Sequence, residues 1–115
     1  MAGRLVSMLM ESRTQAHKYH LNTRSFSRHK GLQNYYEGIV PLLDSYAEAY
    51  MGRYGKLNMR STTNRANSDM VAYFVRLYNE IEKMKLPQDS HLRNIQDAIM
   101  ELISSTIYKL RNLRV

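Results

Sequence analysis

Most of the chain repeats apolar residues at alternating steps of three and four, the spacing of a helix with one buried face. Four such segments emerge, at about residues 4–22, 27–51, 67–85 and 89–113. The stripe of the first segment consists of Leu5, Leu9, Ser12 in a gap, Ala16 and Tyr19, and that of the second consists of Leu32, Tyr36, Ile39, Leu43, Tyr46 and Tyr50. The stripe of the third segment consists of Met70, Phe74, Leu77, Ile81 and Met84. The stripe of the fourth segment consists of Leu92, Ile95, Ile99, Leu102, Leu110 and Leu113. Four amphipathic helices predict an all-α, antiparallel four-helix bundle.

The residues between the segments favour these boundaries. The stretch 52–64 has glycine where a helix would end and polar residues beyond it. Pro87 separates the last two segments. Side chains that can accept hydrogen bonds from the first turn of a helix precede the second and fourth segments: Ser25, Ser27, Asp89 and Ser90.

Pro41 falls inside the second segment, where it removes a backbone donor and crowds the carbonyl of Glu37. It lies on the side away from the apolar stripe, where a freed carbonyl can reach water or another subunit. We therefore expect one bent helix rather than two.

The link between the second and third segments leaves the topology open. A helix of about 24 residues is about 36 Å long, and about twelve extended residues reach about 40 Å. A crossover along the bundle and a simple up-down-up-down order are therefore both feasible. The short first and third links make those helix pairs antiparallel in either case.

Length and composition limit the class of protein to which the chain can belong. A chain of 115 residues suits one domain with a single core. It has no cysteine, which excludes disulfides, thiolate metal sites and a cysteine nucleophile. No apolar run approaches the roughly 18 residues of a membrane span, and the first residues do not read as a secretory signal. We expect a cytoplasmic protein without a membrane partner.

Three of the four histidines, His17, His20 and His29, lie between residues 17 and 31. On the second segment Asp44 and Glu48 are one turn apart, on the side opposite the apolar stripe. Imidazole and carboxylate groups bind iron, zinc or manganese where three or four of them converge. The plainer interpretation is a polar helix end and a solvated acidic face.

A metal site in the core of a single chain is not supported. Bundle-core di-iron sites use Glu-x-x-His pairs that project inward, and no such pair occurs in this sequence. Any site must form on the outer faces of the first two helices, which means between subunits.

The stretch "AHKYHLNTRSFSRHKGLQNYYEGIVPLLDSYAEAY" resembles the first two helices of the Dps miniferritins. That family has a histidine in its first helix, a loop with a phenylalanine, a second histidine, and then Asp and Glu four apart. The resemblance implies ferritin-like bundles that assemble into shells, oxidise iron and often bind DNA. It also implies an iron site with two histidines from one subunit and two carboxylates from the other.

The spacings from His17 to His29 and from His29 to Asp44 fit that family, although His20 competes with His17 because "HLN" resembles the family's His-Trp-Asn. Gln33 stands where the family has a further carboxylate. The likeness covers some forty residues. The pattern also resembles small ferritin-like proteins of tailed bacteriophages, whose function is not established.

Two functional hypotheses follow. The first is a homo-oligomeric, ferroxidase-like protein that binds iron, or zinc or manganese, through His17 or His20 with His29 and a neighbour's Asp44 and Glu48. The alternative is a non-enzymatic phage protein for assembly or host interaction, in the host cytoplasm or virion. The formal charge of +7 adds nonspecific DNA binding as an accessory activity of either, with these candidate residues: Arg24, Arg28 and Lys30.

Overall fold

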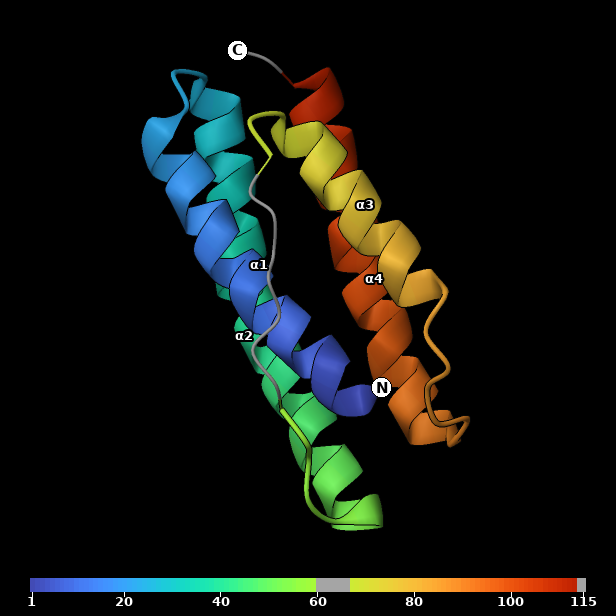
Figure 1. The fold of residues 1–115 in the computed structure, drawn as a ribbon. Coiled ribbons are helices and arrows are strands. Elements are labelled where there is room, and N and C mark those ends of the chain that lie inside the picture. The colour runs from blue at the N-terminus through green and yellow to red at the C-terminus, as the bar shows by residue number, and fades with distance from the viewer. Residues whose placement is uncertain (60–66, 114–115) are drawn as a thin grey trace.

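The computed structural model describes residues 1–59 and 67–113. Within these ranges the chain forms four helices, α1 (Ala2–Asn22), α2 (Phe26–Tyr54), α3 (Met70–Glu82) and α4 (Ser90–Asn112). They lie side by side in an elongated bundle of 44 × 26 × 22 Å (Figure 1). The predicted all-α, antiparallel four-helix bundle is confirmed.

The bundle has one long crossover. Both α2 and α3 run from the upper end to the lower end in Figure 1, whereas α1 and α4 run upward. The link between α2 and α3 must therefore span the length of the bundle, and the two orders that the sequence left open are resolved in favour of the crossover. Of that link, the part from 60 to 66 lies outside the described residues.

Helix ends follow the local chemistry closely at some positions. The Ser25 side chain accepts a hydrogen bond from the backbone N–H of Arg28, and Ser25 is the N-cap of α2. At the other end α2 continues past Gly52 and stops at Gly55, whose φ of 92° favours glycine. The helix also continues without interruption through Pro41.

The third helix is shorter than the pattern predicts. Asp69, and not a residue near 67, is its N-cap, and its carboxylate accepts the N–H groups of Val71 and Ala72. At its other end α3 stops at Glu82, although Met84 still packs into the core. Apolar periodicity alone therefore overestimates helix length, because buried loop residues extend the same stripe.

Asp89 precedes α4 but does not use its side chain as a cap. Its carboxylate accepts a hydrogen bond from the Tyr54 hydroxyl and forms an ion pair with Arg53 at 3.4 Å. The hydrogen bond from Tyr54 holds the pKa of the Asp89 carboxyl below its ordinary value. These contacts join the end of α2 to the start of α4.

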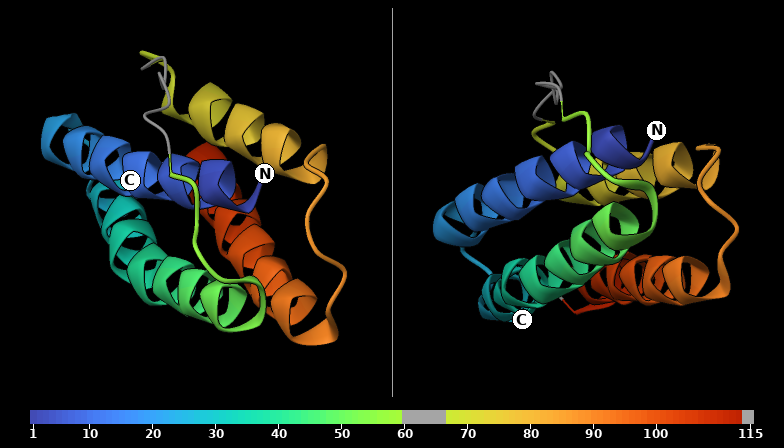
Figure 2. Two further views of the ribbon diagram at one scale, coloured as in Figure 1. Left: turned by 60° about the horizontal axis from the view of Figure 1, so that its bottom comes forward. Right: turned by 90° about the horizontal axis from the view of Figure 1, so that it is seen from below.

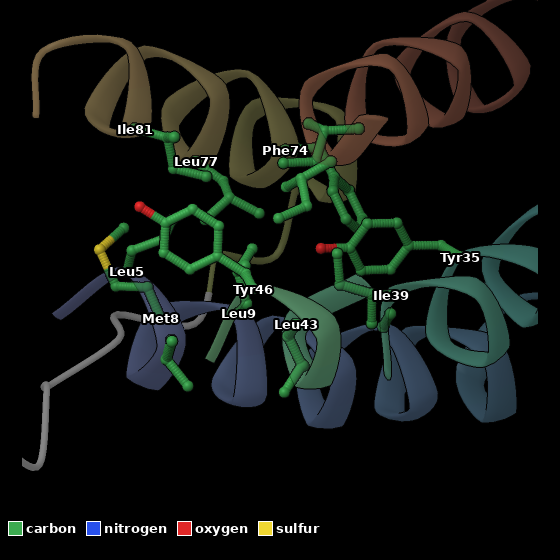
Figure 3. Packing of buried hydrophobic residues seen from close by; sticks show 14 of the residues in the cluster. Leu5, Met8, Leu9, Tyr35, Ile39, Leu43, Tyr46, Phe74, Leu77 and Ile81 are labelled. Carbon is green, nitrogen blue, oxygen red and sulfur yellow. The ribbon is translucent and has the colours of Figure 1, made fainter. Parts of the chain in front are cut away.

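The core contains most residues of the predicted apolar stripes, but Leu113 is 43% exposed and one position on α2 differs from the prediction. Tyr35 is fully buried there, whereas Tyr36, which the stripe predicted, is only partly buried. Figure 3 shows Tyr35 beside Ile39 and Phe74, with Tyr46 among Leu5, Leu9 and Leu77. Ser12 fills its gap by donating to the Leu9 carbonyl at 2.7 Å. Ile103 and Thr106 of α4 are buried as well, although neither was on the predicted stripe.

Gly3 allows the crossover to approach α1. A Cβ atom at this position would lie 2.0 Å from the Asn58 carbonyl oxygen, far inside contact distance. Leu57, the preceding residue, is buried in the core and fixes the crossover against the helix.

Replacement of Gly3 by alanine is expected to lower the free energy of unfolding by about 1 to 3 kcal/mol, because backbone must shift to admit the methyl group. Chemical denaturation measures the effect. Gly52→Ala is the matched control, since nothing lies within 4 Å of the added atom and alanine favours a helix by roughly 0.5–1 kcal/mol. Equal effects of the two substitutions would show that the crossover does not press on α1.

Candidate functional site

The three histidines meet where α1 ends and α2 begins. The turn at 23–25 reverses the chain, so the last residues of α1 lie against the first residues of α2 (Figures 1 and 2). His17 and His20 come from α1, and His29 comes from α2. His20 is buried, with 7% of its surface exposed, and the other two are partly buried.

Two hydrogen bonds join His20 and His29. The Nδ1–H of His20 donates to the His29 carbonyl at 2.7 Å, and the Nδ1–H of His29 donates to the His20 carbonyl at 2.8 Å. A carbonyl can only accept, so the proton is on Nδ1 of both rings, and Nε2 is the nitrogen that can bind a metal or a further proton. The His20 carbonyl is among the last four of α1, which lack helical partners.

The two rings are also stacked, with centroids 3.6 Å apart and planes 22° apart. An ion about 2.1 Å from both Nε2 atoms would lie well outside at least one ring plane. A shared ion therefore requires one ring to rotate out of the stack. In the described part of the chain, no three His, Asp or Glu side chains are close enough together to hold a metal ion.

Tyr36 extends the imidazole cluster. Its ring stacks on His17 at 4.6 Å and meets His20 edge-on at 5.3 Å. The Arg13 guanidinium lies over the same ring, 5.5 Å from the centroid. The apolar stripe predicted Tyr36 in the core, and no sequence pattern pointed to Arg13. These contacts join α1 to α2, so no spacing within either helix could have indicated them.

Asp44 and Glu48 lie on the exposed side of α2. Fifteen residues separate His29 from Asp44, a rise of about 22 Å along the helix, so they do not meet within one chain. Among the described residues, neither carboxylate forms an ion pair, in contrast to Glu80 with Arg4 and Asp89 with Arg53. The five predicted ligands thus form two separate groups, and their union across subunits stays a prediction.

The three predicted DNA-contact residues differ in their surroundings. Arg24 and Lys30 are exposed at the α1–α2 turn. The Arg28 Nε–H donates to the Leu110 carbonyl at 3.0 Å, which places a cation at the C-terminus of α4, where the helix dipole favours it. Arg28 therefore has a structural role in joining α2 to α4. DNA binding by these residues stays a prediction.

A groove lies away from the histidines. It has a volume of about 450 Å³ and lies over α3 and α4, lined by Tyr78, Asp97, Glu101 and Tyr108 among others. Asp97 and Glu101 repeat the four-residue spacing of Asp44 and Glu48 on another helix. They are a natural control for experiments on the α2 acids.

The fold defines an all-α protein of the antiparallel four-helix bundle class with one crossover. The chain belongs to a family of unknown function, DUF5856, whose model matches residues 20–110 and so includes the α1–α2 turn, Asp44 and Glu48. No curated protein and no solved structure matches the sequence. Across the described residues, no helix combines the length and apolar character that crossing a membrane requires.

Proposed function

We propose that this protein is a symmetric dimer that binds a transition metal ion, with iron as the first candidate, between the histidines of one subunit and the α2 carboxylates of the other. The observation that carries the proposal is the outer face of α2. It presents Val40, Asp44 and Met51 within about 40° of one another, and His29, at the edge of this face, packs on His20 of α1. Val40 and Met51 are 37% and 44% exposed, an apolar surface on the side away from the core.

A twofold axis near Val40 would bring the two groups of ligands together. Positions equally distant from residue 40 face each other when two copies of α2 pack antiparallel. Tyr36 then faces Asp44 of the partner subunit, and His17 stacks on that same tyrosine. Glu48 of the partner subunit then lies level with the buried Leu32 along the helix axis, less than one turn from His29.

The ligand chemistry favours iron, zinc or manganese. Two imidazoles and two carboxylates are the donors that these metals take in the absence of thiolates. The Nδ1–H bonds of His20 and His29 fix the tautomer in which Nε2 binds a metal, as the outer partners of metal-bound histidines do. The single crossover is the connectivity of ferritin-like bundles, which supports the same function.

Metal analysis of the purified protein, combined with its mass in solution, tests the proposal. We expect stoichiometric metal in a dimer, and oxidation of added ferrous iron. Asp44→Ala/Glu48→Ala should lose the metal, because an imidazole pair alone binds too weakly. The matched control Asp97→Ala/Glu101→Ala removes the same spacing of acids from α4 and should retain it.

Val40→Lys separates the two parts of the proposal. It places two like charges at the axis and should weaken the dimer by about tenfold or more, with loss of metal in the monomer. Met59→Lys, at another exposed position, should leave the dimer intact. A wild-type monomer without metal would contradict the proposed function.

One observation favours the second function, a non-enzymatic assembly or interaction protein. His20 and His29 are engaged with each other through both rings and both Nδ1–H groups, an arrangement that fastens α1 to α2 without a metal. In that case a protein partner would be captured equally with and without a chelator. Partner binding that disappears with the chelator would exclude this function.

A further inference from the structure

The crossover gathers positive charge at one end of the bundle. We define the basic end as residues 18–30, 67–72 and 107–113, which lie together at the top of Figure 1. This end has one of the ten acidic residues, Asp69, whose carboxylate caps α3. It has six of the 17 lysines and arginines: Lys18, Arg24, Arg28, Lys30, Lys109 and Arg111.

The same end exposes large apolar side chains. Leu21 and Phe26 are 70% and 69% exposed, the highest values among the large apolar residues in the described part of the chain. They flank the α1–α2 turn, beside Arg24. Leu113, 43% exposed, lies near Phe26 because its carbonyl accepts a hydrogen bond from Ser27 Oγ at 2.8 Å.

The α1–α2 turn that bears Leu21 and Phe26 is held in place by contacts with the rest of the bundle. Ser25 caps α2, Arg28 binds the Leu110 carbonyl, and the stacked His20 and His29 rings join the two helices. A ligand that contacts the turn therefore does not have to order it first, which lowers the entropic cost of binding.

Contrary to the sequence-based expectation of no membrane partner, we propose that the basic end docks on an anionic lipid surface. Leu21 and Phe26 enter the interface between headgroups and acyl chains, and the surrounding cations contact the headgroups. Clustered lysine and arginine attract anionic headgroups, each contributing about 1 kcal/mol. Exposed apolar side chains add insertion at the boundary. Nucleic acid fits less well, because it would contact the cations and the Phe26 ring but leave the exposed Leu21 and Leu113 without an apolar partner.

Co-sedimentation with vesicles tests this docking. Wild-type protein should bind phosphatidylcholine vesicles that contain phosphatidylglycerol, bind less at high salt, and not bind pure phosphatidylcholine. Arg24→Gln/Lys30→Gln should lower binding by about fivefold for each cation removed. Lys83→Gln/Lys85→Gln makes the same change in net charge at the opposite end of α3 and should bind as wild type does.

The apolar contribution is tested separately. Leu21→Ser/Phe26→Ser should lower vesicle binding by about tenfold or more at unchanged net charge, while Met59→Ser, also exposed, should have no effect. Circular dichroism verifies that each variant is folded. A gel shift with duplex DNA tests the alternative ligand. The serine variant should bind duplex DNA with the same affinity as the wild type. Absence of wild-type binding to the anionic vesicles at low salt, or equal binding by the serine variant, would overturn the proposal.

Discussion

Replacement of Phe74 by alanine is expected to lower the free energy of unfolding by about 3 to 5 kcal/mol. Phe74 lies on α3 with no exposed surface. Its ring meets Tyr35 of α2 edge-on at 4.8 Å, so it joins α3 to the opposite helix pair (Figure 3). Since α3 is the shortest helix, losing this ring removes a large share of its buried contact.

The chain contains its own control for this substitution. Phe26 is the only other phenylalanine, and it is 69% exposed. Phe26→Ala makes the same chemical change at the surface and should alter the free energy of unfolding by less than about 0.5 kcal/mol. Both values come from denaturant unfolding monitored by circular dichroism. Similar losses for the two variants would mean that α3 is not held by Phe74.

Tyr46→Phe is expected to stabilise the protein by about 1 to 3 kcal/mol, the opposite direction from most core substitutions. The Tyr46 side chain is fully buried, and its hydroxyl has no hydrogen-bond partner among the described residues. Burial raises the pKa of Tyr46 to about 12. A buried donor without a partner loses its hydration on folding and gains nothing in return, so phenylalanine removes a cost.

Tyr35→Phe is the matched comparison on the same helix. The Tyr35 hydroxyl lies 2.6 Å from Ser12 Oγ, and Ser12 already donates its proton to the Leu9 carbonyl. Tyr35 is therefore the donor, and burial raises its pKa as well. Removal of this hydroxyl should destabilise the protein by about 1 kcal/mol. Stability changes of the same sign in both variants would contradict this account of the two tyrosines.

The order of the helices and most of their buried faces could be predicted from the sequence. Helical periodicity is local, because residues three and four apart share a face whatever the rest of the chain does. For the same reason Ser25 could be predicted as a cap, since its partner, the Arg28 N–H, is three residues away. The prediction that any metal site lies outside the core of one chain used only the absence of Glu-x-x-His, and it stays a prediction.

Helical periodicity could not predict that Tyr35, and not Tyr36, is the buried tyrosine at this level of α2. The two residues are 100° apart on α2, and both fit a stripe of threes and fours. Which of them is buried depends on the neighbouring helices. Tyr35 contacts Ser12 and Phe74 in the core, whereas Tyr36 contacts His17 and Arg13. Those neighbours lie on other helices, so periodicity within α2 cannot distinguish the two tyrosines.

By itself the sequence determined that this protein is a bundle of four amphipathic helices with Asp44 and Glu48 on an outer face of α2, because helix faces are set by near neighbours in the chain. Only the tertiary structure decided that α3 runs parallel to α2, that His20 and His29 stack, and that six cations collect at one end. These features depend on contacts between residues far apart in sequence, such as Arg28 with Leu110, and a local pattern does not specify which distant partner a helix end will meet.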